Sequence, residues 1–451
     1  MLFSYVDVLF SKHITLLLRS SMILFFACVA NLKDSGQDPI DTSIIDKTRS
    51  LSQNANWITD SKGYATGFAT ADINQDGLVD VVISYGNDMD TGPIEIYINE
   101  EGILPTSPDW TSYTTEFYGH ISTGDINGDG YPDIIASRYI GSSDFSESGG
   151  IDVYINQQGV FFATPDQRYD GLYSFGNALG DIDNDGDLDL AIATGEVYTQ
   201  QKQSVEIWKN EDGYFYPYWT QDGVGYAYDV CFGDVNNDTQ VDLLIVQNEQ
   251  PHCWYISNGS TLESTPYWCS EDSVSQLGNR CVVGDFNSND QLDWMISNTD
   301  QSNSDLGFVD LWMDRELVWQ SETSDMYSGI AMWKQDEHLE FYISSWWGSV
   351  VGYEWIEDQP VEFWRSNNSN IVAEELLVFS PQSEIQSVQG EGFWTVPLGN
   401  IILSVEGGVY TSHQIYASGD WTATIAFSKD PSVFVSNWDP QTGSLGYFPI
   451  E

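Results

Sequence analysis

Hydrophobic positions along the chain recur in short alternating runs rather than with a long helical period. The runs "VVIS", "IIAS", "AIAT", "LLIV" and "MIS" each follow directly after an aspartate-rich stretch. A second set of alternating runs ends in Asn and Gly, as in 94–102, 151–159 and 205–213. Short alternating runs bounded by turn residues predict β-strands, so the pattern predicts an all-β chain.

The aspartate-rich stretches repeat with an almost constant phase. They begin at Asp72, Asp125, Asp181, Asp234 and Asp285, at steps of 53, 56, 53 and 51 residues. Trp57, Trp110 and Trp219 each lie 15 residues before one of these starts. A period of about 50 residues indicates a repeat array. Each unit is expected to contain an inner strand, the Asp loop, a second and a third strand, and an outer strand, as in the four-stranded antiparallel blades of a β-propeller. A solenoid or a tandem of sandwiches is the structural alternative.

Further candidates for the second strand continue after the aspartate signature fades, at 341–346, 401–407 and 433–438. Eight blades therefore fit best, with seven as the alternative, and 375–380 has no place in this scheme. The C-terminal run from 432 supplies a second and a third strand, and residues 51–63 carry Trp57 in the outer-strand phase. We expect the two termini to share the last blade, which closes the ring and removes exposed sheet edges.

The spacing inside each aspartate-rich stretch matches an oxygen-ligand loop. In "DINGDGYPD", positions 1, 3, 5 and 9 are Asp125, Asn127, Asp129 and Asp133, Gly130 permits the turn, and Tyr131 at position 7 offers its carbonyl. Carboxylates this close repel one another unless a cation lies among them. Ligand type favours calcium, about five ions in all, with a structural role. The other expected ligands are Asp72, Asn74, Asp76, Leu78, Asp80, Asp181, Asp183, Asp185, Asp187, Asp189, Asp234, Asn236, Asp238, Gln240, Asp242, Asp285, Asn287, Asn289, Gln291 and Asp293.

Composition supports strands and excludes some partners. Aromatic residues make up 14% of the 451 residues, which favours strands, and 39 glycines supply turns. The formal net charge of −53 argues against nucleic acid and against electrostatic binding to anionic membranes. Five divalent ions would offset only ten of these charges, so most of the excess is a solvated acidic surface.

The N-terminus reads as an export signal. Lys12, His13 and Arg19 precede the apolar run 22–30, and polar sequence follows. We expect residues 1–30 to be a signal peptide or lipoprotein signal, with lipidation of Cys28 as the less favoured outcome. Residues 31–50 are expected to be a polar tether and 51–451 the propeller. The chain is then secreted or on the cell surface, and it meets a membrane only through an N-terminal lipid or anchor.

Four further cysteines, Cys231, Cys253, Cys269 and Cys281, allow three disulfide pairings in an exported chain. Cys253 and Cys269 flank an apparent hairpin, so we expect these two to be linked. Cys231 and Cys281 precede successive Asp loops at nearly equivalent positions, and their pairing is left open.

The D-x-[DN]-x-[DN]-G-x-x-D loops in units of about 50 residues resemble the FG-GAP/VCBS repeats of integrin α-subunit propellers and of many secreted microbial proteins. The match is strong over 51–300 and rests on strand pattern alone over 301–451. The resemblance implies calcium in the loops, an extracellular location and recognition through loops on one face of the propeller. The fourth and fifth loops depart from the pattern, because Thr239 and Asp290 replace the glycine.

Two functions from different classes remain. The first is a non-catalytic binding or adhesion module for a glycan or a protein, which would use the variable turns between second and third strands (85–93, 138–150 and 298–307). Trp346 and Trp347 are candidate ligand-binding residues, with core packing as the alternative. The second is a calcium-dependent lyase or hydrolase acting on acidic polysaccharides, which needs a base and a cation. His120, His252, His338 and His413 lie apart and Lys and Arg are scarce, so no catalytic residue is predicted.

Overall fold

The computed structural model describes residues 57–365 with short gaps, together with six strands beyond residue 365. The gaps are 62, 79, 87, 89, 101–102, 271–276, 288, 300–306, 336–337 and 346–349. All described residues belong to one compact unit, Lys47–Glu451. Nothing in the described part of the chain forms a helix that could cross a membrane.

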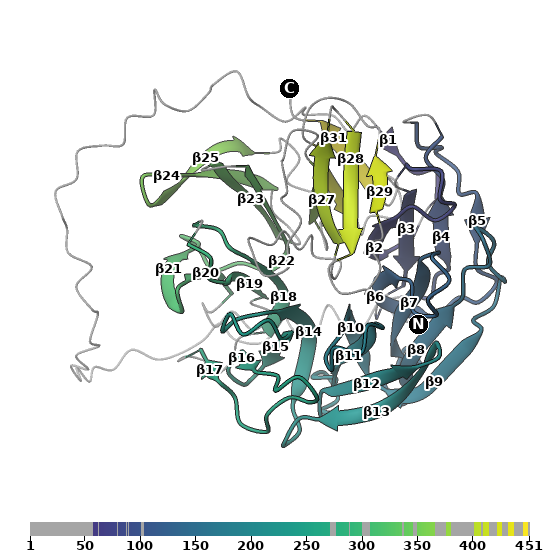
Figure 1. Cartoon of the computed structure of the whole chain (residues 1–451), viewed down its shortest axis with the longest axis horizontal. Coiled ribbons are helices and arrows are strands. Elements are labelled where there is room, and N and C mark those ends of the chain that lie inside the picture. Colours follow the sequence, from purple (N-terminus) through teal and green to yellow (C-terminus); the bar gives the residue numbers. More distant parts are fainter. Residues whose placement is uncertain are drawn as a thin grey trace, which may run out of the picture. The chain divides into compact units, whose positions relative to one another are not determined.

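Four-stranded antiparallel sheets follow one another along the chain (Figure 1). The first contains β2 (Ala65–Ala71), β3 (Asp80–Tyr85), β4 (Ile94–Tyr97) and β5 (Trp110–Thr111). The second contains β6 (Phe117–Gly124), β7 (Asp133–Ile140), β8 (Ser148–Tyr154) and β9 (Gln167–Leu172). The third contains β10 (Ser174–Gly180), β11 (Asp189–Thr194), β12 (Glu206–Glu211) and β13 (Tyr214–Thr220).

The next two sets of four strands are joined through one pairing, Asn248 with Leu277. They contain β14 (Tyr226–Gly233), β15 (Asp242–Asn248), β16 (Cys253–Tyr255), β17 (Trp268–Cys269), then β18 (Leu277–Gly284), β19 (Asp293–Thr299), β20 (Val309–Met313) and β21 (Glu316–Gln320). The last of the regular sheets contains β22 (Tyr327–Gln335), β23 (His338–Ser345), β24 (Val351–Ile356) and β25 (Gln359–Arg365). The expected all-β class with four-stranded antiparallel sheets is confirmed.

Two sheets use the remaining strands. One has the order β1-β31-β30-β26 and contains β1 (Trp57–Ile58), β26 (Leu376–Phe379), β30 (Ser432–Ser436) and β31 (Leu445–Pro449). The other has three strands, β27 (Ile401–Glu406), β28 (Val409–Gln414) and β29 (Thr422–Ile425). The expected second strand 401–407 is therefore part of a three-stranded sheet, and the segment 375–380, which had no place, pairs with β30.

Hydrophobic cores lie between consecutive sheets, because both faces of each inner strand are covered. Every residue of β3 and β11 is buried, whereas the outer strand β13 buries only Phe215 and Trp219. Glycines in the first strands permit the close approach. A Cβ on Gly119 of β6 would lie 2.3 Å from the Phe175 carbonyl oxygen of β10. Inner strands of neighbouring sheets thus pack backbone against backbone at this level.

Two disulfides link strands in this region. Cys253 of β16 is bonded to Cys269 of β17, its direct cross-strand partner. Cys231 of β14 is bonded to Cys281 of β18, which joins the first strands of two consecutive sheets. The sequence separations are 16 and 50 residues.

We expect removal of the Cys231–Cys281 bond to destabilise the chain more than removal of Cys253–Cys269. In the chain-entropy model a 50-residue separation is worth about 4 kcal/mol and a 16-residue separation about 3 kcal/mol. The double variants Cys231→Ser/Cys281→Ser and Cys253→Ser/Cys269→Ser are compared by urea unfolding. Equal midpoints and slopes for both variants and the parent would contradict this expectation.

Candidate metal centres in five aspartate loops

The first aspartate of each loop caps the turn that follows it. In the second loop, Asp125 Oδ1 accepts from the Asp129 amide at 3.1 Å and Oδ2 accepts from the Gly130 amide at 2.7 Å. The same two bonds recur at Asp72, Asp181, Asp234 and Asp285. These bonds hold the loop closed and bring its side chains to one place.

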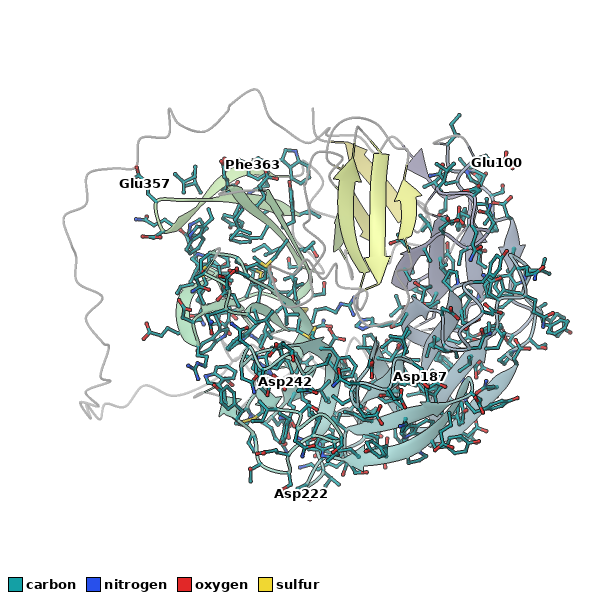
Figure 2. The ribbon with its side chains drawn as sticks, viewed as in Figure 1. Glu100, Asp187, Asp222, Asp242, Glu357 and Phe363 are labelled. Carbon is teal, nitrogen blue, oxygen red and sulfur yellow. A yellow bond between two sulfur atoms is a disulfide. The ribbon has the colours of Figure 1, made fainter. Side chains whose placement is uncertain are left out.

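The ninth residue of each loop is a fully buried aspartate that begins the second strand. Asp133 Oδ2 accepts from the Ile126 amide in its own loop at 3.0 Å, and Oδ1 accepts from the Asn156 amide just after β8 at 2.7 Å. One carboxylate therefore ties together the loop, the second strand and the end of the third. The equivalents are Asp80, Asp189, Asp242 and Asp293. Asp242 is labelled in Figure 2.

The turn survives in the two loops that lack the glycine. Position 6 has a left-handed φ of 91° at Gly130 and 94° at Gly186, and also of 70° at Thr239 and 62° at Asp290. A residue with a Cβ is strained there, but the two amide bonds to the first aspartate are kept. The departure from the sequence motif thus leaves the loop geometry unchanged.

Burial makes these carboxylates expensive to ionise. Desolvation raises the pKa of Asp80 and Asp133 to about 8, and that of Asp189, Asp242 and Asp293 to about 7. Desolvation also raises the pKa of the first aspartates of the first four loops, Asp72, Asp125, Asp181 and Asp234. A bound cation would favour the ionised forms, because it supplies the charge that water no longer screens.

The third loop offers oxygen atoms that fit a metal ion. Carboxylate oxygens of Asp181, Asp183 and Asp189 lie within 4.8 Å of one another. Asp183 Oδ1 and Asp187 Oδ1 are buried and accept no hydrogen bond from the described residues. A cluster of hard oxygen donors with unsatisfied acceptors is the donor set that calcium takes, so the residues fit the implied ion.

A lysine that the sequence analysis missed lies against this loop. The Lys209 ammonium contacts Asp183 and lies 2.7 Å from Asp185 Oδ2. The third loop carries five aspartates. In the first, second and fourth sheets the position equivalent to Lys209 is apolar and is occupied by Ile98, Ile155 and Ile256. The available signal was this single departure from an apolar position.

Side chains also connect the loop of one sheet with the next sheet. Asn156 Nδ2, just after β8, donates to the Ile73 carbonyl in the first loop at 2.9 Å, and Asn210 Nδ2 of β12 donates to the Ile126 carbonyl in the second at 2.7 Å. These are the asparagines that close the third-strand runs in the sequence. The repeat therefore couples neighbouring sheets through polar contacts as well as through apolar cores.

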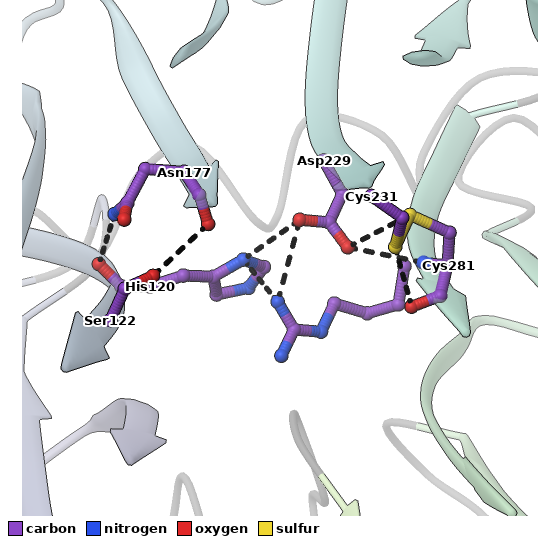
Figure 3. Close-up of a disulfide and its surroundings, with 7 residues drawn as sticks. His120, Ser122, Asn177, Asp229, Cys231 and Cys281 are labelled. Atoms are coloured by element: carbon purple, nitrogen blue, oxygen red, sulfur yellow. Dashed lines mark hydrogen bonds and ion pairs between the residues drawn. A yellow bond between two sulfur atoms is a disulfide. The ribbon is translucent and has the colours of Figure 1, made fainter. Parts of the chain in front are cut away.

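A second cluster, which the sequence analysis did not find, joins first strands of three sheets (Figure 3). His120 of β6 accepts from Arg280 of β18 at 2.5 Å through Nδ1, and Asp229 of β14 lies 3.6 Å from Arg280 and 3.7 Å from His120. All three are almost fully buried. Burial, then the charge of Arg280, lowers the pKa of His120 to about 4, so the imidazole is neutral.

The signal for this cluster was positional. Each of these three residues lies five positions before the first aspartate of its loop, where Gly67 and Gly176 stand in the other two repeats. Repeat phase therefore predicts that they share one level of the first strands, although 160 residues separate His120 from Arg280.

Other predicted residues lie outside the described part of the chain. Trp346 and Trp347 fall in the gap 346–349, and Cys28 lies before the first described residue. The position-7 residues Leu78, Tyr131, Gln240 and Gln291 lie in the described loops, where they were expected to offer backbone carbonyls.

Comparison with known proteins gives matches that include a repeat family and a curated enzyme. Residues 72–136 match the FG-GAP-like repeat. The chain is 30% identical over 151 residues to phosphatidylinositol-glycan-specific phospholipase D of Mus musculus. This match covers 28% of the chain and 17% of the relative, so the chain spans less than a fifth of that enzyme.

Solved structures resemble the chain in fold at low sequence identity. The structure of BBS1N in complex with ARL6DN superposes with a TM-score of 0.50 at 10% identity, over 88% of this chain and 98% of that one. The rhamnogalacturonan lyase PL11 of Bacillus licheniformis gives 0.41 at 13% identity, over 89% and 75%. The chain has an all-β fold built from four-stranded antiparallel sheets and is similar in fold to β-propellers, and its residues 72–136 are similar to the FG-GAP-like repeat.

Proposed function

We propose that this chain is a calcium-binding propeller that acts outside the cell as a non-catalytic binding module for a glycan or a protein. The observation that carries the proposal is a contrast between the two ends of the sheets. Five Asp loops at one end repeat the same hydrogen bonds. The turns at the other end, between second and third strands, differ in length and sequence from sheet to sheet. Variable turns on a repeated scaffold suit ligand recognition.

The ring is proposed to be closed and to have seven blades, the alternative count. Support comes from the sheet β1-β31-β30-β26, in which Trp57 pairs with Tyr447 and β26 pairs with β30. This sheet draws its outer strand from the other terminus, as the sequence predicts for a closed propeller. The strands β27–β29 then form a sheet inserted between β26 and β30 rather than an eighth blade.

Calcium is proposed to be structural. Most of the proposed ligands are carboxylates, and burial disfavours the ionised form of those at the ninth position of each loop. An ion at each loop would relieve this cost and add to the stability of the blade. The chain supplies the ligands and fixes them with backbone amides, and no reaction step is assigned to the metal.

An enzyme acting on polysaccharides is the second candidate, and the His120–Asp229–Arg280 cluster favours it. It places a neutral imidazole beside a guanidinium, the pair that proton abstraction next to a carboxylate needs. However, His120 and Arg280 are each only 2% exposed, so a substrate cannot reach them in this structure. The binding module therefore stands as the proposed function.

Chelation is expected to lower the melting temperature by several degrees or more, and calorimetry with calcium should count about five sites. Asp125→Ala should remove one site and leave the fold, because the other loops keep theirs. Asp222→Ala is the matched control, since Asp222 is an exposed aspartate between β13 and β14 and belongs to no loop (Figure 2). Melting curves that do not respond to the ion would exclude structural calcium.

In the metal-free chain, stability is expected to fall as the pH rises from about 6.5 to about 8. Unfolded aspartates, with a pKa of about 4, are ionised throughout this range, whereas the folded state holds protons on Asp80, Asp133 and their equivalents until pH 7 to 8. Rising pH removes those protons at a cost of up to about 1.4 kcal/mol per group and pH unit.

The buried histidines make the folded chain more stable as the pH rises, but only at lower pH. The pKa of His120 and His252 is lowered to about 4 in the folded state, so their effect ends near the unfolded value of about 6.5. Urea unfolding in the presence of a chelator at about pH 6.5 and about pH 8 measures the difference in unfolding free energy. Saturating calcium should abolish this difference. A metal-free chain that gains stability over this range would contradict the assigned pKa directions.

The proposed binding role is tested on arrays of glycans and extracellular proteins with and without calcium. Capture should require calcium, because the turns depend on blades that the ion stabilises. Replacing the 141–147 turn with a shorter turn should alter the set of captured ligands without changing the melting temperature. Release of unsaturated or reducing sugar ends from acidic polysaccharides by the purified chain would replace the binding role with the enzymatic one.

A further inference from the structure

The third aspartate loop differs from the other four in its charge. It has aspartate at every odd position from 181 to 189, whereas each of the other loops contains three aspartates. The two additions are Asp183 at position 3 and Asp187 at position 7. Position 3 of the other loops is asparagine, at Asn74, Asn127, Asn236 and Asn287. Because carboxylates this close repel one another, the third loop has the greatest need for positive charge.

The asparagine at position 3 stabilises the loops in which it occurs. In the first loop, Asn74 Nδ2 donates to Asp76 Oδ2 at 3.0 Å, and in the fourth loop Asn236 Nδ2 donates to Asp238 Oδ2 at 2.9 Å. The amide thereby joins the side chains at positions 3 and 5. An ionised aspartate at position 3 has no N–H to donate, so it would repel the carboxylate at position 5.

Lys209 of β12 provides the missing donor in the third loop. Its ammonium contacts Asp183 and lies 2.7 Å from Asp185 Oδ2, so it bridges the carboxylates at positions 3 and 5. The side chain of Asp183 is 10% exposed and that of Lys209 is 24% exposed. The ion pair is therefore largely shielded from water, which strengthens it relative to an exposed pair.

The lysine and the extra aspartate occur in the same sheet. The residue after Lys209, Asn210, donates its backbone amide to the ninth aspartate of the loop, Asp189, at 2.8 Å. The same amide bond in the other sheets identifies the equivalents of Lys209 as Ile98, Ile155, Ile256 and Met313. All four are apolar. An acid and a base that replace neutral residues at two contacting positions compensate each other's charge.

The ammonium and a calcium ion compete for the same side chains. Carboxylate oxygens of Asp181 and Asp189 lie within 4.8 Å of one on Asp183, and Asp183 Oδ1 is buried and accepts no hydrogen bond from the described residues. The loop thus keeps oxygen atoms that fit the ion. However, an ion that uses the carboxylates at positions 3 and 5 meets the positive charge of Lys209 or displaces it.

We propose that Lys209 is a built-in cation of the third loop, which compensates the carboxylates at positions 3 and 5 without a metal and weakens calcium binding at this loop. The inference rests on the proposed structural calcium and names the residue that sets the calcium affinity of one loop. Because Lys209 belongs to the chain, its charge is present at every calcium concentration. The third loop therefore stays closed when the ion is removed, whereas the other four loops depend on the ion.

Calorimetric titration with calcium compares the parent with Lys209→Met, which introduces the residue type found at the equivalent position of the fifth sheet. One site of the variant should bind calcium about tenfold more tightly or better than in the parent, because the ion no longer meets a positive charge. Lys202→Met is the matched control. It removes the same charge, but the Lys202 ammonium lies 5.1 Å from the centroid of the Tyr226 ring and outside the loops, so the isotherm should not change.

A second substitution assigns the tightened site to the third loop. Asp181→Ala in the Lys209→Met background should abolish the tightened site, whereas Asp125→Ala in the same background should leave it. Loss of the tightened site with Asp125→Ala and not with Asp181→Ala would place the effect in another loop and overturn the proposal.

Urea unfolding provides an independent readout of the same competition. In the presence of a chelator, Lys209→Met should unfold at a lower urea concentration than the parent, and saturating calcium should remove most of this difference, because the ion replaces the ammonium. Linkage requires the gain in affinity and the extra stabilisation by calcium to agree. An equal loss of stability with chelator and with calcium would mean that Lys209 only packs, and it would overturn the proposal.

The double variant Asp183→Asn/Lys209→Met restores the combination of asparagine and apolar residue that the other loops have. In the presence of a chelator it should be more stable than Lys209→Met, because an asparagine at position 3 can donate to Asp185 as Asn74 does to Asp76. This comparison also covers a Lys209→Met chain that fails to fold without calcium. A double variant that is no more stable than Lys209→Met contradicts the compensating role of the lysine.

The titration separates failure of this inference from failure of the proposed function. Calcium binding with identical isotherms for the parent and Lys209→Met overturns the role of Lys209 alone. A parent chain that binds no calcium at any loop overturns the structural calcium of the proposed function, and the competition with it.

Discussion

The buried aspartate at the ninth position of each loop is the interaction on which the rest of the structure depends. Its two oxygens accept main-chain amides from the loop and from the end of the third strand, while its own backbone begins the second strand. Three segments of one sheet therefore meet at one carboxylate. Because this carboxylate is fully buried, its charge must be removed by a proton or offset by a cation. The fold therefore needs a proton or a cation at each of five regularly spaced buried carboxylates.

Consecutive sheets are coupled at the same level. Asparagine side chains after one third strand bind the loop carbonyl of the preceding sheet, and glycines in the first strands let the backbones approach. The Cys231–Cys281 bond adds a covalent link between two first strands. These contacts use the loop end and the inner edge of each sheet. At the opposite end the turns contact the next sheet through backbone pairings such as Gly92 with Glu116, and they differ in length and sequence from sheet to sheet.

The cluster of His120, Asp229 and Arg280 shows the limit of local pattern. Each residue replaces a glycine position of the repeat, and each is unremarkable within its own strand. Only the approach of three first strands brings the imidazole, the carboxylate and the guanidinium within ion-pair distance.

The sequence alone determined the strand type, the repeat period and the five aspartate loops, because each is written in a window of about 50 residues and recurs in phase. It also placed Trp57 opposite the C-terminal strands, where it pairs with Tyr447. Tertiary structure decided the rest. It set which strand pairs with 376–379 and placed the strand that begins at Ile401 in a three-stranded sheet. It also brought Lys209 against Asp183. Each of these outcomes depends on segments that are separate in the chain. Periodicity reports which face a residue takes within its own strand, but burial and charge pairing are set by whichever strand packs against that face.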